Sequence, residues 1–416
     1  MIKKTATMIM LSSSALVATE VMPEVSDITL ASLCSTCCQP CCECEPCCVP
    51  KPKKCIDCEC YTPQFYDLQC DFGFYFDVEF LYWYAKEQHL PLAVESTIEP
   101  VLREDGTPKD FLLPKKEIFM DSRWDPGFRL GVGFNSECDG WDYYLSWTYM
   151  HNKRTRSRSV APFEDENTPS GTNVLLSPWD TLYPVFVDGD DPQISGYDHI
   201  KGKWRLNYNV VDLELGRKYW LSQCFNFRPF VGLRGAWSRL RFRVKNSFEP
   251  TDESIHNALS TSVAYKNRIW GVGFLGGIQP TWYYSSCFAL YGNANIALLW
   301  GRDDVSRKES IGILPGPGMI EVINPSYSTS ACVDGMQGVL DLAIGLRYED
   351  TYCCDRYRFT FDLGWEHHQW FNYAHKFKVL AIPVDTIEIG NGFVHLDDFN
   401  TDLGLGGLVL RVRFDF

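Results

Sequence analysis

The chain has 416 residues, of which 14% are aromatic and 31 are glycine, and its formal net charge is −14. The acidic balance argues against a nucleic-acid-binding protein and does not favour adsorption to an anionic membrane surface. The mean hydropathy is slightly negative, as expected when half of the residues of each strand face a polar space.

Residues 1–20 are predicted to be a secretory signal peptide. Lys3 and Lys4 form a basic start, and residues 5–18 form a short apolar run. This run is too short to span a bilayer, and no later stretch approaches about 18 uninterrupted apolar residues, so no transmembrane helix is expected. The sequence therefore predicts an exported protein that is either soluble or a β-barrel.

Residues 21–64 are predicted to be a cysteine-rich, disordered periplasmic arm without an apolar core. Disulfides are the favoured interpretation, because exported cysteines meet an oxidising compartment. A thiolate metal cluster ranks second, because Cys34/Cys37, Cys38/Cys41 and Cys55/Cys58 have C-x-x-C spacing but no histidine joins them. We therefore expect no metal and no cofactor. The arm holds eleven of the 18 cysteines: Cys34, Cys37, Cys38, Cys41, Cys42, Cys44, Cys47, Cys48, Cys55, Cys58 and Cys60.

Residues 65–416 are predicted to be one barrel domain, because apolar residues alternate with polar ones in ten separate segments. In the fourth segment the apolar phase changes near Val211, and a β-bulge is expected there. The ten predicted strands lie at about residues 72–82, 128–134, 141–149, 204–215, 229–244, 270–282, 290–300, 340–348, 359–365 and 406–416.

The predicted connections alternate between long and short. Long extracellular loops and short periplasmic turns are typical of transmembrane barrels. The sequence therefore predicts an all-β, antiparallel up-and-down transmembrane barrel of ten strands with both ends in the periplasm. Twelve strands is the alternative, because residues 377–382 and 386–389 could form an extra hairpin. The long links are 85–123, 153–203, 245–265, 302–335 and 373–399, and the short ones are 136–140, 220–225, 283–287 and 351–356.

The last segment has the strictest alternation. Leu408, Leu410, Val412, Phe414 and Phe416 share one face, and the chain stops on the last of these aromatic residues. Outer-membrane barrels of Gram-negative bacteria end in this way, and the terminal aromatic residue is part of the signal that their assembly machinery reads. The expected location is therefore the outer membrane, with its lipid and the barrel assembly machinery as partners.

Several moderately specific motifs follow one another along the barrel domain: GFYFDVEFLYW (73–83), WDPGFR (124–129), GWD (140–142), RPFVGLRGAW (228–237), GWEHH (364–368) and RFDF (413–416). From about residue 65 to the end, they resemble the major outer membrane proteins of Legionella and the porin-like proteins of chlamydia-like bacteria. The resemblance implies an abundant, pore-forming outer-membrane barrel. The cysteine-rich stretch departs from the Legionella members, but it is similar in kind to the cysteine-dependent envelopes of chlamydiae.

Charged residues alternate with the apolar series of the predicted strands. An Arg that faced lipid near the midplane would cost about 2–4 kcal/mol, so these residues are expected to face the lumen. They either pair with one another in a narrow, closed barrel or line a conducting pore. The candidates are Asp77, Glu79, Arg129, Asp142, Arg234, Asp341, Arg347, Glu349, Arg358, Asp362, Glu366, Arg411 and Arg413.

An enzyme is not expected. His367 and His368 are neighbours and would point to opposite faces of a strand. The sequence contains no G-x-S-x-G, H-E-x-x-H or G-x-x-x-x-G-K motif. The favoured function is a porin-like channel for small hydrophilic solutes or ions. The alternative is a structural or adhesive surface protein with a closed barrel, and in either case oligomers are conceivable.

Six further cysteines lie at one end of the predicted barrel. They are expected to form disulfides with the arm or with other cysteine-rich envelope proteins; the alternative is that each is a harmless small residue. Not all pairs could meet directly, because a disulfide needs a Cα separation of roughly 4.4–6.8 Å. Cys70 precedes the first strand, Cys332 alone falls in a long link, and the short turns hold Cys138, Cys224, Cys287, Cys353 and Cys354.

Overall fold

The computed structural model describes residues 73–102, 108–136, 140–161, 171–180, 196–222, 224–248, 258–285, 287–314, 326–353, 356–382 and 393–416. The predicted signal peptide and cysteine-rich arm lie outside these residues, as do Cys70, Cys138 and Cys354. The part of the chain that is described consists of strands and their turns. It contains no helix that is long and apolar enough to cross a membrane.

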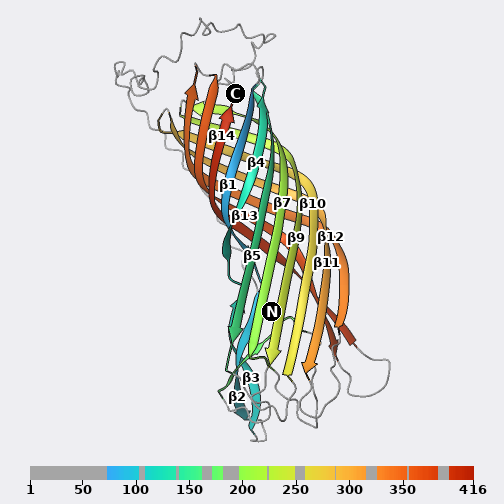
Figure 1. Ribbon diagram of the computed structural model, residues 1–416. Helices are drawn as coiled ribbons and strands as arrows, with labels where there is room; N and C mark the ends of the chain where they lie inside the picture. The colour runs from blue at the N-terminus through green and yellow to red at the C-terminus, as the bar shows by residue number, and fades with distance from the viewer. Residues whose placement is uncertain are drawn as a thin grey trace, which may run out of the picture. The chain divides into compact units, whose positions relative to one another are not determined.

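Ten antiparallel strands form a closed barrel, which confirms the predicted fold class. The first and last of them, blue and red in Figure 1, lie side by side and pair from Tyr75↔Asp415 to Glu87↔Leu403. The pairing of β9 with β10 completes the ring. In order around the barrel, the strands are β1 (Phe74–Glu87), β4 (Arg123–Asn135), β5 (Trp141–Ser159), β7 (His199–Arg217), β9 (Phe225–Phe248), β10 (Ala258–Tyr283), β11 (Phe288–Leu314), β12 (Ser326–Tyr352), β13 (Tyr357–Ile382) and β14 (Phe393–Asp415).

Four short strands lie outside this ring. β8 (Tyr219–Ser222) follows β7 and pairs with β9 next to the turn. A separate sheet has the order β3-β2-β6 and is built from β2 (Pro91–Leu102), β3 (Pro108–Phe119) and β6 (Asn173–Leu176). The two predicted links 85–123 and 153–203 therefore carry regular structure of their own.

One end of the barrel has a lipid-facing outer surface. On β1, Phe80 is 50% exposed whereas Asp77 is 1% exposed, so the apolar side chains point outward and the acidic ones inward. Exposed tryptophans end this surface on three neighbouring strands: Trp237 lies opposite Trp270, and Trp300 lies opposite Val272. Such a row is expected where a membrane meets water. The short turns lie at the other end, which makes that end periplasmic and the tryptophan row extracellular.

Beyond the tryptophan row the strands continue, but their apolar side chains now lie on the inner face and their polar side chains on the outer face. On β9, Leu240, Phe242 and Val244 are buried and face inward, while the residues between them are exposed. The barrel strands are therefore much longer than their lipid-facing parts. The predicted links 245–265 and 302–335 are largely strand, because β10 begins at Ala258 and β11 runs to Leu314.

The predicted β-bulge near Val211 is wrong. β7 pairs with β5 and β9 in unbroken register through this residue. The apolar phase changes because the interior changes. Every second residue from Trp204 to Val210 faces an apolar interior, whereas Asp212 and Glu214 face a polar one. A register shift occurs instead in β13, between Trp370 and Ala374, where Asn372 has a φ of 50°.

The alternative of twelve strands is also wrong for the part that can be followed. Residues 377–382 continue β13 and pair with β14, from Phe377↔Asp398 to Ile382↔Phe393. Residues 386–389 lie outside the described residues.

Candidate functional site in the barrel interior

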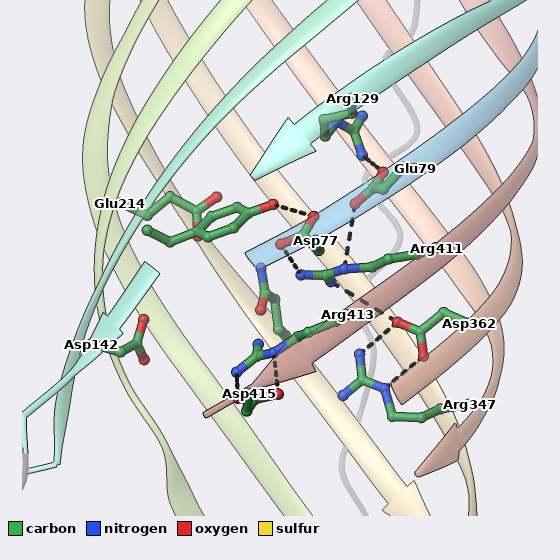
Figure 2. Close-up of polar contacts among 12 residues, drawn as sticks. Asp77, Glu79, Arg129, Asp142, Glu214, Arg347, Asp362, Arg411, Arg413 and Asp415 are labelled. Atoms are coloured by element: carbon green, nitrogen blue, oxygen red, sulfur yellow. Dashed lines mark hydrogen bonds and ion pairs between the residues drawn. The ribbon is translucent and has the colours of Figure 1, made fainter. Parts of the chain in front are cut away.

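Charged side chains fill the membrane-level part of the interior. Arg129 of β4 contacts Glu79 of β1 at 2.5 Å (Nη1 to Oε2) and Glu366 of β13 at 3.0 Å (Nη2 to Oε2). Arg411 of β14 lies 3.1 Å from Asp77 and 3.5 Å from Glu79. Figure 2 shows how Arg129 of β4, the two acids of β1 and Arg411 of β14 converge. Because Arg411 also lies 3.9 Å from Asp362 of β13 (Nη1 to Oδ2), each guanidinium neutralises carboxylates from more than one strand.

A second group lies nearer the periplasmic turns. Arg347 donates from Nε and Nη2 to the two carboxylate oxygens of Asp362, at 2.8 and 2.9 Å. Arg413 binds Asp415 at 2.6 Å (Nη2 to Oδ1), and its guanidinium lies 3.6 Å from the centre of the Tyr75 ring. These contacts hold the two arginines in fixed positions, because their donors bind carboxylates and the guanidinium of Arg413 also lies over an aromatic ring.

Arg234 links opposite walls of the barrel. It donates from Nε and Nη2 to Asp212 of neighbouring β7 at 2.7 and 2.8 Å. Its Nη1 donates across the lumen to Asp341 of β12 at 2.6 Å. The ring of His368 lies between Asp341 and Glu366, at 2.7 Å (Nδ1 to Oδ1) and 3.1 Å (Nε2 to Oε2). Both ring nitrogens therefore have carboxylate partners.

The structure places all thirteen predicted lumen residues on the inner surface. Arg358 contacts Glu349 at 3.3 Å (Nη1 to Oε1). Asp142 contacts Arg228, which also binds Glu214 at 2.8 Å (Nη1 to Oε2).

Sequence analysis missed five members of this charged interior. Asp212 and Glu214 alternate with Leu213 and Leu215, so period two could have found them. Asp415 alternates with the terminal phenylalanines in the same way. The other two missed residues are Arg228 and His368.

The charged interior encloses a polar cavity of about 210 Å³. Its walls include Arg228, Arg234, Asp341 and Arg347 together with Tyr283. Because the cavity lies among paired charges, it is suited to water and small ions and not to an apolar ligand.

Apolar side chains close the extracellular part of the interior. We call this group the apolar plug; its large, fully or nearly fully buried members include Leu81, Trp83, Trp179, Trp204, Leu206, Leu240, Phe242, Tyr265, Trp370 and Phe377. They belong to one continuous cluster. The segment 171–180 enters this cluster: the indole of Trp179 packs against Phe242 and Tyr265, with ring centres 5.0 and 5.6 Å apart.

Hydrogen bonds also join opposite walls at the level of the plug. Tyr265 Oη of β10 donates to the carbonyl oxygen of Phe377 of β13 at 2.8 Å. Asn267 of β10 donates to the carbonyl oxygen of His375 at 2.7 Å, and Tyr373 Oη donates to Ser238 of β9 at 2.7 Å. β9 and β10 are not neighbours of β13 in the barrel. The walls therefore contact each other directly.

Asp180 is a buried acid within the plug. Asp180 Oδ2 accepts hydrogen bonds from Tyr197 Oη, Asn246 Nδ2 and Thr261 Oγ1, at 2.6, 2.7 and 3.1 Å. Burial nevertheless dominates and raises the pKa of Asp180 to about 6. This carboxyl group ties the segment 171–180 to β9 and β10, and at neutral pH it does so as a buried anion.

The described turn cysteines lie at the periplasmic end, between consecutive barrel strands. Cys224 lies between β8 and β9, Cys287 between β10 and β11, and Cys353 between β12 and β13. The carbonyl oxygen of Cys224 accepts from Tyr283 N at 2.7 Å, and that of Cys287 accepts from Glu349 N at 2.8 Å. Cys332 was expected in a long link, but it lies within β12 and is exposed.

Among the residues that the structure describes, no group of three or more His, Cys, Asp or Glu side chains is arranged to hold a metal ion.

Several solved structures are similar to this chain at low sequence identity. The outer membrane protease OmpT of Escherichia coli is 10% identical with a TM-score of 0.32, over 84% of this chain and 97% of that one. A Pseudomonas aeruginosa FadL homologue is 8% identical with a TM-score of 0.23, over 83% and 90%. The Pseudomonas putida toluene transporter TodX is 8% identical with a TM-score of 0.22, over 86% and 95%.

No curated protein matches the chain. The family described as Legionella pneumophila major outer membrane protein precursor matches residues 71–416, which includes every barrel strand. The closed barrel and this match place the protein in the outer membrane of a Gram-negative bacterium, and the chain belongs to the family of the Legionella major outer membrane protein.

Proposed function

We propose that the protein is a structural outer-membrane barrel with a closed interior, and that its extracellular end presents a surface to the outside of the cell. The apolar plug carries this proposal. Trp83, Trp204 and Phe242 are fully buried, and a residue that lined a water path would be exposed to it. The hydrogen bonds between opposite walls support the same conclusion, because they leave the strands no gap at this level.

Planar-bilayer recordings test the proposal. Purified, refolded full-length protein is expected to give no opening steps at any voltage, whereas a general porin prepared in the same way conducts. Heat-modifiable migration on a gel would show that the tested sample is a folded barrel. Reproducible unitary steps from the folded protein would contradict a closed barrel.

A porin-like channel for small hydrophilic solutes or ions is the second candidate function. The polar cavity among Arg228, Arg234 and Arg347 favours it, because charge-lined spaces of this kind select ions in pores. Conduction would require the plug to move, since hydrophobic constrictions gate pores by excluding water. In that case the bilayer recording would show steps, and charge changes at Arg234 or Arg347 would alter ion preference.

We further propose that the interior has no catalytic role. His368 is the best candidate for a base, but it is buried and both of its ring nitrogens lie against carboxylates. A general base needs a free nitrogen within reach of substrate. His367 is its neighbour on β13 and belongs to the opposite face of the strand.

We also propose that periplasmic disulfides anchor the barrel in the envelope. The support is the position of Cys224, Cys287 and Cys353 in the turns of three successive hairpins. In this proposal the arm (residues 21–64) or neighbouring cysteine-rich envelope proteins supply the partner thiols, because exported cysteines are readily oxidised.

Envelopes extracted with a thiol-blocking agent test this anchoring. On gels without reductant we expect high-mass species that collapse to monomer when reductant is added. The matched control is the Cys332→Ser variant, which lacks only the exposed thiol of β12 and should give the same ladder. Monomer in both lanes, with the turn cysteines alkylated in intact cells, would contradict the proposal.

A further inference from the structure

The outer surface of β5, β7, β9 and β10 is strongly basic just beyond the tryptophan row. One row of cross-strand neighbours consists of Lys153, Arg205, Arg241 and Lys266, on four consecutive strands. These side chains point outward, because their neighbours along the strands, such as Leu206 and Phe242, are buried in the plug.

Further rows lie on either side of this one. Arg239 and Arg268 are opposite each other on the membrane side. Lys203 and Arg243 are opposite each other on the far side, and beyond them Lys201 is opposite Lys245. We call the surface formed by these rows the basic wall. All of its side chains are exposed except Lys266, which is half-buried.

Such a surface is unfavourable for the fold itself. Like charges directly opposite each other on neighbouring strands are destabilising. Acidic residues do not offset them: Asp304 lies opposite Arg268, but among the described residues no carboxylate forms an ion pair with a side chain of the wall. The chain as a whole carries a net charge of −14, so composition does not explain the wall either. An external anion is the remaining source of neutralisation.

The position of the basic wall relative to the membrane boundary indicates which anion can contact it. Strands rise roughly 3.3 Å per residue, so along β9 Arg239 lies about 7 Å and Arg241 about 13 Å beyond Trp237. The row from Lys153 to Lys266 is about 14 Å wide, because neighbouring strands are roughly 4.8 Å apart. The wall faces sideways, continuous with the lipid-facing surface below the tryptophans. The headgroups of the surrounding outer leaflet therefore lie directly against its lower rows.

We propose that the basic wall binds the phosphate groups of glycolipid headgroups in the outer leaflet of the outer membrane. Arg239 and Arg268 contact the phosphates nearest the acyl chains, and the row from Lys153 to Lys266 contacts those farther out. Arginine suits this role because its planar group binds phosphate through two donors. The binding surrounds one side of the barrel with ordered lipid and offsets the repulsion within the wall.

Binding of fluorescent lipopolysaccharide to the purified full-length protein in neutral detergent tests the proposal. The Arg205→Glu/Arg241→Glu variant is expected to bind at least about thirtyfold more weakly, because each cation near an anionic surface contributes roughly fivefold in affinity and the two new carboxylates repel phosphate. The matched control is Lys115→Glu/Lys116→Glu, which makes the same charge change at exposed positions of β3 and should bind as the unchanged protein does. Dephosphorylated lipopolysaccharide should bind weakly to all three proteins.

Heat-modifiable migration shows whether each variant is folded, and Arg205→Gln/Arg241→Gln replaces the charge reversal if that variant does not fold. Equal binding by the wall variant and the control variant would overturn the proposal. So would equal binding of phosphorylated and dephosphorylated glycolipid. A protein that binds heparin but not lipopolysaccharide would also overturn it, because the wall would then recognise a soluble polyanion.

Discussion

Replacing Trp204 with alanine is expected to destabilise the apolar plug by about 3–5 kcal/mol, the usual range for a buried aromatic side chain. Trp204 is completely buried, and its Nε1 donates to Glu87 Oε2 at 2.5 Å. The guanidinium of Arg154 lies 4.0 Å from the ring centre. The substitution therefore removes packing, a hydrogen bond to a buried carboxylate and a cation–π contact together.

Hydrogen exchange followed by mass spectrometry can measure this loss in the folded barrel. Peptides from the extracellular parts of β7 and β9 should exchange faster in Trp204→Ala, while peptides from the lipid-facing parts should not change. Trp300→Ala is the matched control, because it removes the same side chain at a position that is 69% exposed at the membrane boundary. Equal exchange in the two variants would mean that the plug does not hold the extracellular walls together.

The barrel itself could be predicted from sequence because period-two alternation is a property of each strand alone. Phe76, Val78 and Phe80 share a face whatever lies around them, and lipid requires that face to be apolar over the whole membrane span. The count of ten strands followed from the number of such segments. Strand lengths did not follow for strands such as β11 and β12, because their extracellular parts lack a regular apolar alternation.

β7 shows what alternation leaves undecided. It indicates which residues share a face, but not what that face meets. Trp204, Leu206 and Tyr208 lie on the same face as Asp212 and Glu214, and the change from apolar to acidic reflects two different surroundings along one continuous strand. From sequence this change is equivalent to a slip of one residue, so a bulge was predicted. The plug depends on contacts between strands that are distant in sequence, such as Tyr265 with Phe377, and no local pattern encodes them.

The basic wall was hidden for a different reason. A net charge of −14 averages over the whole chain and does not favour adsorption to an anionic membrane surface. Arg239, Arg241, Arg243 and Lys245 alternate with apolar residues and could have been noticed as a basic face of one strand. That three more strands present cations in the same rows depends on register, which requires the fold.

Replacing Arg234 with alanine is expected to cost about 3–5 kcal/mol of barrel stability, because it leaves buried charges without their partner. Asp212 and Asp341 are both buried, and Arg234 binds one through two donors and the other across the lumen. His368 would remain as the only cation next to Asp341 among the described residues. Neutralising the carboxylates as well, in Arg234→Gln/Asp212→Asn/Asp341→Asn, should restore much of the stability.

Arg302→Ala provides the comparison within the same molecule. Arg302 forms the same kind of bidentate pair with Asp334, at 2.7 and 3.1 Å, but both side chains are exposed on the outer surface of β11 and β12. Removing an exposed pair costs at most about 1 kcal/mol, because water already solvates both ions. In guanidinium unfolding of the refolded proteins in detergent, the loss of unfolding free energy should therefore be several times larger for Arg234→Ala than for Arg302→Ala. If Arg234→Ala and Arg302→Ala unfolded at the same denaturant concentration, the interior charges would be solvated, and the charged interior would be a water-filled space continuous with the periplasm instead of a packed network.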